Sequence, residues 1–280
     1  MVRPVPAPGD RWVVLRAPNE VFVVDTPHGL RIAVEFETPP VDAAPLAVGR
    51  EDDVRIWAVG TDERMSAPAG GAFVGARQLV GALDSAAFGL LARARMLVEW
   101  ERTHRYCGVC GTATAVAADE HAVECSQCGL RSYPRISPAV IVAVTRGEQI
   151  LLAQPRRAPR AMHTVLAGFV EAGESLEQTV AREISEEVGI TVGDLTYVGS
   201  QAWPFPHALM VAFTARYASG EIVPDPIELT DVGWYAADAL PELPPRGSIA
   251  RALIDEFVRT HTRDVRRARA GGPRATRGSG

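Results

Sequence analysis

Acidic residues crowd one stretch of the sequence, the 23 residues from Gly168 to Ile190, which read GFVEAGESLEQTVAREISEEVGI. Near its end stand Glu183, Glu186 and Glu187, at spacings that place them side by side if the segment is helical. Like charges at these spacings destabilise a helix unless they are neutralised. Hard cations such as Mg²⁺ or Mn²⁺ would neutralise them, because these ions take oxygen ligands and also bind substrate phosphates. The stretch therefore predicts a divalent-metal site.

A helix has to hold these glutamates. Ser175, with Gln178 three residues later, forms a capping box that starts a helix near Leu176, and Gly189 is the expected stop. At about 100° per residue, the glutamates overlap the apolar stripe of this helix, so carboxylates intrude on the buried face. The stripe comprises Leu176, Val180, Ile184 and Val188. An ordinary amphipathic helix with a solvated acidic face is the alternative interpretation.

All four cysteines of the chain fall in two C-x-x-C pairs, Cys107 with Cys110 and Cys125 with Cys128. Fourteen residues separate the pairs, and a glycine follows each pair. Such pairs can each form a tight turn around one tetrahedral ion, which predicts a zinc ribbon over residues 104–133. Four thiolates leave no open position on the ion, so the zinc would be structural. Two disulfides are the alternative, disfavoured in a reducing compartment.

A third segment, Ser200 to Pro206 (SQAWPFP), combines aromatic residues with prolines. Pro204 and Pro206 favour an extended backbone, which gives Trp203 and Phe205 pre-set positions for a ligand. An ordinary loop anchored by buried aromatic residues is the alternative.

Short β-rich runs separated by turn residues occupy residues 11–60 and predict an antiparallel N-terminal domain. Asp84 is the expected N-cap of a helix that continues to about Arg102. After Pro134 strands and helices alternate, and a last helix is predicted from Ser248 to about Thr260. Strands are predicted at residues 139–144, 149–153, 164–170, 195–201, 209–217 and 231–235. The resulting domains are 1–103, 104–133 and 134–262, followed by a tail, 263–280.

Charge is unevenly distributed along the 280 residues. The net charge is −5, but six Arg and one Asp give the tail +5, which leaves −10 on residues 1–262. The tail has few apolar residues and is expected to be disordered, with binding of nucleic acid as an alternative role. All 29 basic residues are Arg, so lysine nucleophiles are excluded. No apolar run is long enough for a membrane span, and a cytoplasmic protein is expected.

The stretch from Gly168 to Ile190 matches every fixed position of the Nudix box, so the chain resembles the Nudix hydrolases. With a four-cysteine ribbon before the box and SQAWPFP after it, the chain is similar to the NADH pyrophosphatase (NudC-type) branch from about Arg77 to Arg259. The branch motif has Pro at Ala202 and commonly Gln-Ser at His207-Ala208. The resemblance implies an α+β protein in which a β-rich domain and a zinc ribbon precede a Nudix α/β/α sandwich with a mixed sheet.

The same resemblance implies a set of site residues. Glu174 and Arg182 join the three box glutamates in the catalytic set and shape its loop–helix–loop. The metal ligands would be Glu183, Glu186, Glu187, Glu228 and the carbonyl of Ala167. The substrate-binding residues would be Arg77, Tyr133, Phe169, Gln201, Ala202, Trp203, Pro204, Phe205, Pro206, His207, Ala208 and Ala250.

By that resemblance, the reaction is hydrolysis of the pyrophosphate bond of NADH or NAD⁺, which gives AMP and nicotinamide mononucleotide. Two or three Mg²⁺ or Mn²⁺ ions per site and one structural Zn²⁺ per chain are implied, in a homodimer whose sites draw on both subunits. Removal of the NAD cap from RNA needs the same cleavage and is an alternative. A nucleic-acid-binding module that senses a nucleotide is another. The sequence leaves open the preferred substrate, ADP-ribose included, the general base, the preferred metal and the role of the tail.

Overall fold

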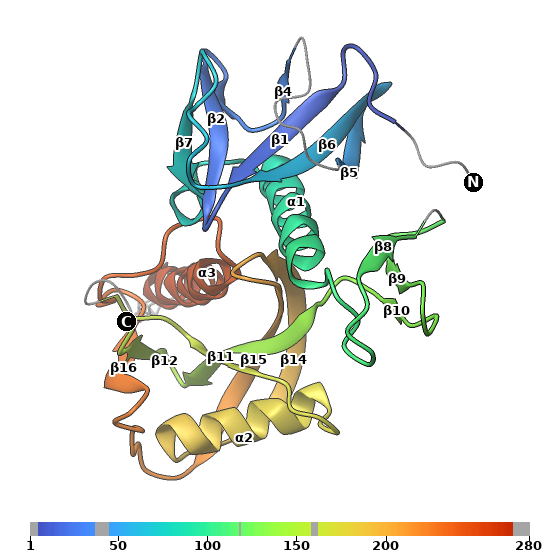
Figure 1. The fold of residues 1–280 in the computed structure, drawn as a ribbon. Helices are drawn as coiled ribbons and strands as arrows, with labels where there is room; N and C mark the ends of the chain where they lie inside the picture. The colour runs from blue at the N-terminus through green and yellow to red at the C-terminus, as the bar shows by residue number, and fades with distance from the viewer. Residues whose placement is uncertain (1–4, 37–44, 118, 158–161, 271–280) are drawn as a thin grey trace, which may run out of the picture. The chain divides into compact units, whose positions relative to one another are not determined.

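The computed structural model describes residues 5–36, 45–117, 119–157 and 162–270 (Figure 1). The chain divides into two compact units. The first comprises Met1–Ser137 together with Ala202–Leu209, and the second comprises Pro138–Gln201 and the chain from Met210 onward. The short segment 202–209, which follows the SQ of SQAWPFP, therefore packs as part of the first unit.

A seven-stranded sheet forms most of the first unit, with the order β3-β2-β1-β6-β5, while β4 pairs with β1 and β7 pairs with β2. Its strands are β1 (Arg11–Arg16), β2 (Glu20–Thr26), β3 (Gly29–Arg31), β4 (Val34–Glu35), β5 (Leu46–Glu51), β6 (Val54–Thr61) and β7 (Ala72–Gly75). The expected β-rich domain is confirmed. The strand β7 lies beyond the predicted range of residues 11–60.

The expectation of an antiparallel sheet is wrong at its centre, because β1 and β6 run parallel from the pair Arg11–Ile56 to the pair Arg16–Thr61. Four other strands separate β1 from β6 in the chain, which provides the long connection that parallel pairing needs. β1 is buried on both faces: Val13 and Leu15 belong to one apolar cluster and Trp12 to another. The alternation of side chains along the strand produces this division.

The helix α1 (Ser85–Thr103) covers one face of this sheet, after the 3-10 turn η1 (Ala76–Leu79). Asp84 caps α1 as expected, since its side chain accepts a hydrogen bond from the Ala87 amide. The buried side of α1 includes Phe88, Leu91, Leu97 and Trp100. After α1, the strands β8 (Thr114–Val116), β9 (Val123–Cys125) and β10 (Arg131–Ser132) form a separate antiparallel sheet that carries the cysteines.

The second unit contains a six-stranded sheet with the order β14-β15-β11-β12-β16, and β13 pairs with β11. Its strands are β11 (Ser137–Arg146), β12 (Gln149–Pro155), β13 (Leu166–Phe169), β14 (Thr191–Trp203), β15 (Ala208–Ser219) and β16 (Leu229–Ala236). Figure 1 shows the helices α2 (Leu176–Val188) and α3 (Ile249–Ala270) on opposite sides of this sheet. Ile141 and Ala143 of β11 cluster with Leu253 and Phe257 of α3. The expected sandwich of sheet and helices is confirmed.

The final helix is longer than expected. It continues from Ile249 to Ala270, so residues 263–270 are helical, whereas the sequence analysis placed a disordered tail from residue 263. Ala and Arg favour helices, and no Gly or Pro interrupts the chain before Gly271. The remainder of the predicted tail, 271–280, lies outside the described residues. Within the described ranges, none of the helices is both long enough and apolar enough to span a bilayer.

Candidate metal centre and active site

The acidic helix α2 begins and ends where its sequence predicts. The Ser175 hydroxyl accepts from the Gln178 amide at 3.3 Å, and the Gln178 side chain accepts from the Ser175 amide at 2.8 Å, which completes the capping box. Gly189 ends the helix in the left-handed region, with φ of 73°. These local contacts fix where the box glutamates lie on the helix.

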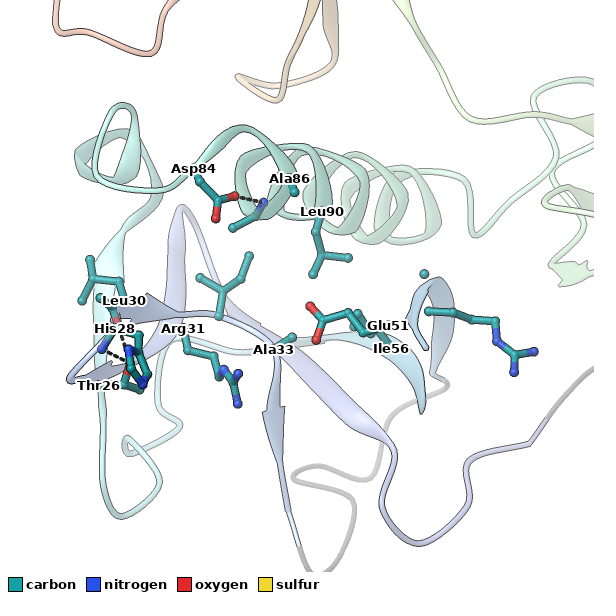
Figure 2. A pocket seen from close by; sticks show the side chains of 15 residues that line it. Thr26, His28, Leu30, Arg31, Ala33, Glu51, Ile56, Asp84, Ala86 and Leu90 are labelled. Atoms are coloured by element: carbon teal, nitrogen blue, oxygen red, sulfur yellow. Dashed lines mark hydrogen bonds between the residues drawn. The ribbon is translucent and has the colours of Figure 1, made fainter. Parts of the chain in front are cut away.

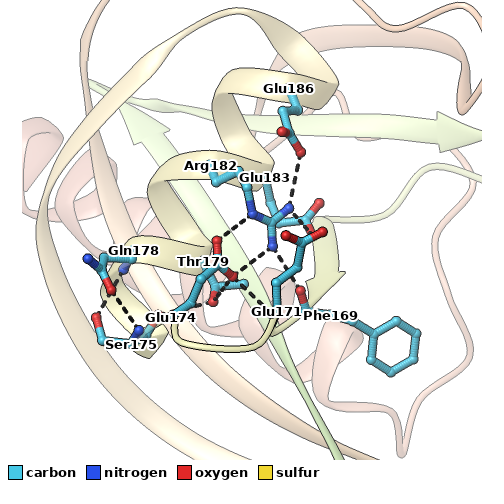
Figure 3. Close-up of polar contacts among 9 residues, drawn as sticks. All are labelled: Phe169, Glu171, Glu174, Ser175, Gln178, Thr179, Arg182, Glu183 and Glu186. Carbon is cyan, nitrogen blue, oxygen red and sulfur yellow. Dashed lines mark hydrogen bonds and ion pairs between the residues drawn. The ribbon is translucent and has the colours of Figure 1, made fainter.

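Arg182 is the centre of an ion-pair network at the start of α2 (Figure 3). Its guanidinium binds both carboxylate oxygens of Glu174, at 2.6 and 2.9 Å. It also donates to Glu183 at 2.9 Å and to Glu186 at 3.0 Å, and to the Phe169 carbonyl at 2.9 Å. One cation thus joins the helix, the preceding loop and the end of β13. The geometry gives Arg182 a structural role in holding the acidic residues.

Glu174 is fully engaged by this network. Besides Arg182, its carboxylate accepts hydrogen bonds from the Thr179 hydroxyl at 2.9 Å and the Glu171 amide at 3.0 Å. The bond to Arg182, followed by that to the Glu171 amide, lowers the pKa of Glu174 to about 2. A carboxylate whose oxygens are all occupied by donors is poorly suited to hold a metal or move a proton. We therefore interpret Glu174 as a residue that shapes the loop.

Glu183 lies against the backbone of β13. A Cβ atom placed on Gly168 would meet the Glu183 carboxylate at 1.8 to 2.2 Å, so only glycine fits beneath this side chain. Ala167, whose carbonyl was expected to be a metal ligand, is the adjacent residue of β13 and is exposed. Burial raises the pKa of Glu183, although its bond to Arg182 opposes the shift. Glu183 therefore lies against the residue that follows Ala167 in β13.

Glu187 lies on the buried side of α2, with only 7% of its surface exposed. Burial is the main cause that raises its pKa to about 8, and the charges of Glu183, Glu228 and Asp225 add to it. Among the described residues, no cationic side chain pairs with Glu187. The predicted intrusion of a carboxylate on the apolar face is confirmed, and the solvated-face alternative is wrong for Glu187. A divalent cation would offset this buried charge.

The other acidic residues are more accessible. Glu186 is exposed, and its side chain contacts Arg182. Glu228 is also exposed and follows Asp225, whose amide donates to the Glu187 carbonyl at 2.8 Å, so the loop before β16 is attached to the end of α2. These acids do not form a cluster with ligand atoms within 4.8 Å of one another. This wider spacing suits Mg²⁺ or Mn²⁺, which retain water ligands between carboxylates and phosphates.

The four cysteines are the group of ligating side chains, among the described residues, whose atoms do lie within 4.8 Å of one another. Their sulfur atoms are 3.4 to 3.8 Å apart in the pairs Cys107–Cys128, Cys110–Cys125 and Cys110–Cys128. Four sulfurs at 2.3 Å from a tetrahedral zinc would be about 3.8 Å apart. All four thiols are free, so the disulfide alternative is wrong.

Both halves of the cysteine site use the same turn. The amide of Gly111 donates to the Cys107 carbonyl at 2.9 Å, and that of Gly129 donates to the Cys125 carbonyl at 2.9 Å. Both glycines have φ of 71°, in the left-handed region that glycine adopts without a steric penalty. The residues present fit a structural zinc ion.

Two predicted substrate residues of the second unit differ in accessibility. Phe169 is 56% exposed, and its ring points away from the Arg182 network (Figure 3). Gln201, in contrast, uses both ends of its side-chain amide within the protein. It donates to the Gly247 carbonyl and accepts from the Ile249 amide, each at 2.8 Å. Gln201 thus fixes the start of α3 beside half-buried Ala250, a role that the sequence did not reveal.

Tyr133, in the first unit, is 55% exposed and donates its hydroxyl to Glu120 at 3.0 Å. Glu120 also binds Arg131, which in turn pairs with Asp119 and Glu124. This acidic group was not predicted from the sequence. Its signal is the Asp-Glu pair in the hairpin between the cysteine pairs.

The aromatic residues of the segment 202–208 are packed against the core of the first unit. Trp203 and Phe205 are half-buried, with ring centroids 5.2 Å apart, and Trp203 also lies 6.2 Å from Phe88 of α1. The guanidinium of Arg77 lies 4.4 Å from the centroid of Phe205. Pro204 and Ala208 are buried, Ala202 and His207 are half-buried, and Pro206 is exposed. Anchoring by aromatic residues, the alternative interpretation, therefore describes the packing of Trp203 and Phe205.

A cavity of about 470 Å³ opens in the N-terminal domain between the β2–β3 hairpin, β5 and the start of α1 (Figure 2). Its two acidic residues are engaged, because Glu51 pairs with Arg11 and Asp84 caps α1. None of the residues predicted to bind metal or substrate lines this cavity.

Comparisons with known proteins agree with this geometry. Residues 135–257 match the NUDIX domain family, residues 102–133 the NADH pyrophosphatase zinc ribbon domain, and residues 9–100 the NADH pyrophosphatase-like rudimentary NUDIX domain. The NAD-capped RNA hydrolase NudC of Pseudomonas aeruginosa (strain LESB58) is 43% identical over 260 residues, which cover 91% of this chain and 92% of that protein. The NAD-capped RNA hydrolase NudC of Deinococcus radiodurans is 42% identical, over 90% of this chain and 92% of that protein. That of Escherichia coli (strain SMS-3-5 / SECEC) is 48% identical, over 76% of this chain and 80% of that protein. The chain therefore belongs to the NudC family of Nudix hydrolases, the NADH pyrophosphatases with a zinc ribbon.

Proposed function

We propose that this protein hydrolyses the pyrophosphate bond of NADH and NAD⁺ and releases AMP and nicotinamide mononucleotide. The observation that carries the proposal is Glu187, a buried carboxylate without a cationic partner among the described residues, held beside Glu183 on a complete Nudix helix. Such a site is costly for the fold unless it binds metal ions.

Glu183, Glu187, Glu228 and the carbonyl of Ala167 would hold two or three Mg²⁺ or Mn²⁺ ions, with Glu186 at the exposed edge. When bound, the ions supply a water of lowered pKa and positive charge beside the pyrophosphate. Arg182 keeps Glu183 and Glu186 in place through its bonds at 2.9 and 3.0 Å. A general base would be Glu186, whose carboxylate is open to solvent, or Glu187.

Exposed aromatic rings support recognition of a dinucleotide. Phe169 and Tyr133 each expose more than half of their surface, so their rings are accessible to a ligand. A base stacked on such a ring gains about 1–3 kcal/mol. Gln201 would act by holding the helix start at Ala250, whose amide finds no acceptor among the described residues.

Removal of the NAD cap from RNA is the second candidate. The relatives that cover 76–91% of this chain are NAD-capped RNA hydrolases, and capped RNA presents the same pyrophosphate bond. The nucleotide-sensing alternative is less well supported, because a sensor does not require the complete set of box acids.

Product analysis tests these proposals directly. NADH, NAD⁺ and NAD-capped RNA should be incubated separately with the protein and Mn²⁺, with Glu187→Gln as the matched inactive control. Release of AMP and nicotinamide mononucleotide from NADH or NAD⁺ is the expected result. Cleavage of capped RNA alone would replace the first proposal with the second, and cleavage of none of the three substrates would refute both.

We also propose a homodimer in a reducing, cytoplasmic compartment, with one zinc ion per chain. Four free thiols in tetrahedral spacing support the zinc and the reducing compartment. Exposed apolar side chains on and beside the ribbon support an interface with a second copy. They are Tyr106, Val109, Leu130 and Ile136. Sedimentation analysis of the purified protein tests the dimer.

A further inference from the structure

Arg95 of α1 contacts the segment 202–208 in a way that its sequence position does not suggest. Its Nε donates to the Pro204 carbonyl at 3.2 Å, and its Nη2 donates to the side-chain oxygen of Asn19 at 2.7 Å. Its guanidinium also lies 5.5 Å from the centroid of Phe205, the ring that Arg77 contacts at 4.4 Å. One planar side chain thus contacts the backbone and an aromatic ring of the same short segment.

The two arginines are linked through Asn19, in the turn between β1 and β2. Its side chain accepts from Arg95, and its main-chain carbonyl accepts from the Ala76 amide at 2.8 Å, at the start of the turn that carries Arg77. The position of Arg95 is therefore tied to that of Arg77 by a short covalent and hydrogen-bonded path.

No carboxylate lies within 4.0 Å of Arg95 or Arg77 in the part of the chain that the structure describes. Burial lowers the pKa of Arg95, the charge of Glu99 opposes the shift, and the hydrogen-bond donors of Arg95 bind neutral oxygen atoms. Two guanidinium groups around one ring consequently leave positive charge beside the segment. This is the sign that the phosphates of a dinucleotide require in an otherwise acidic chain.

The segment has few other polar restraints. Near its end, the Ser137 amide donates to the His207 carbonyl at 2.9 Å and the Ser137 hydroxyl contacts His207 Nδ1 at 3.2 Å. Within it, the Phe205 amide donates to the Trp203 carbonyl at 2.8 Å. The packing of Trp203 against Phe88 restrains the ring but not the carbonyl of Pro204. Among the described residues, Arg95 is thus the side chain that hydrogen-bonds the backbone in the middle of the segment.

We propose that Arg95 is a positioning residue that holds the backbone at Pro204 and the ring of Phe205 in the conformation that binds the dinucleotide. This inference rests on the proposed function, because it takes the segment 202–208 to contact substrate. Arg95 itself is not assigned a contact with the reacting atoms. Its loss should therefore weaken substrate binding and leave the chemical step nearly intact.

Steady-state kinetics of full-length variants with NADH and Mn²⁺ test this. Arg95→Met retains the length and apolar stem but removes every donor. We expect its KM to rise by at least about tenfold while kcat stays within about threefold of wild type. Arg95→Lys retains the charge but lacks the planar guanidinium that reaches both oxygen atoms. Its KM should therefore lie between that of wild type and that of Arg95→Met. Arg93→Met, an exposed position on the same helix, is the matched control and should behave as wild type.

Asn19→Leu provides a second test if Arg95→Met does not fold. It leaves Arg95 in place but removes one of its two hydrogen-bond acceptors, so KM should rise by about threefold or more with kcat unchanged. If the Arg95 variants fold, an unchanged KM in them would overturn the inference. If the Arg95 variants do not fold, an unchanged KM in Asn19→Leu would overturn it. Equal losses in kcat and in stability would do so as well, since they indicate a purely structural role. Failure of wild-type protein to cleave NADH or NAD⁺ would instead refute the proposed function.

Discussion

The acidic residues of the Nudix box have different roles, although their chemistry is the same. Glu174 is saturated by Arg182, Thr179 and the Glu171 amide, and its pKa lies at about 2. Glu187 is buried without a cation, and its pKa lies at about 8. Environment alone separates two glutamates that the sequence grouped together in one catalytic set. The spacing of the acids was predictable, but their partners were not, because these depend on Arg182 and on the backbone of β13.

Replacement of Glu187 by Gln should abolish activity and stabilise the metal-free fold. Loss of a metal ligand should lower kcat by at least about a hundredfold, or roughly 2.7 kcal/mol of transition-state stabilisation. In metal-free protein the pKa of Glu187 lies above its ordinary 4.5, so ionisation between that value and about 8 costs stability. Gln cannot ionise, and the variant should therefore melt at a higher temperature than wild type near pH 8 but not near pH 4. Thermal denaturation in chelator measures this, and activity within about threefold of wild type at saturating Mn²⁺ would remove Glu187 from the catalytic set.

Glu174→Gln should have the opposite effect on stability. The folded-state pKa of Glu174 is lowered to about 2 from 4.5, so its contribution is complete above about pH 4.5 and is lost as the pH falls towards 2. The variant should therefore be less stable than wild type at neutral pH, and the difference should shrink in acid. Urea denaturation at about pH 7 and about pH 3 compares the two proteins. A difference that stays constant across this range would show that the charge of Glu174 is not responsible.

At the scale of the elements, local signals were sufficient where one segment determines its own structure. The capping box and Gly189 gave both ends of α2, and Asp84 gave the start of α1. Contacts between distant segments were not predictable in this way. The parallel pairing of β1 with β6 joins residues about 45 positions apart, and Gln201 caps a helix 48 positions further along the chain. Neither contact has a local sequence signal.

The zinc ribbon offers an element-scale test, because its three short strands bury few side chains of their own. Cys107→Ser should release the zinc and lower the melting temperature, since structural zinc contributes folding free energy directly. Wild-type protein purified under reducing conditions should contain about one zinc per chain, and the variant should contain almost none. Elemental analysis measures both. Zinc-free wild type that melts like the holoprotein would contradict the interpretation.

Adding single metals back to chelated protein separates the structural metal from the catalytic one. Because the cysteines occupy every position on a tetrahedral ion, zinc should not support the reaction at the box. Added Mg²⁺ or Mn²⁺ should restore activity to chelated protein, whereas added Zn²⁺ alone should not. Equal restoration of activity by Zn²⁺ would show that the assignment of Mg²⁺ or Mn²⁺ as the catalytic metal is wrong.

At the scale of the whole molecule, the residues predicted to bind substrate are distributed over both units of the chain. Residues 202–209 include the end of β14 and the start of β15, yet they pack with the first unit, where Arg77 and Arg95 contact them. The family resemblance predicted that Arg77 and this segment serve one substrate. Arg77 lies 4.4 Å from the centroid of Phe205, and the shared substrate stays a prediction. Under the proposed function, the N-terminal domain has a role beyond its own stability, since Arg77 and Arg95 contact a segment that we propose binds substrate.

The C-terminal arginines are the remaining feature of the whole chain whose role can be tested. Truncation after Thr262 removes a charge of +5 and leaves the core of α3, Leu253, Ile254 and Phe257, in place. NADH hydrolysis should therefore proceed as in wild type. If the arginines bind RNA, cleavage of capped RNA should slow selectively, and each lost phosphate contact should flatten the slope of log affinity against log salt by about 0.7. Equal cleavage rates and equal salt dependence for truncated and full-length protein would show that residues 263–280 take no part in RNA binding.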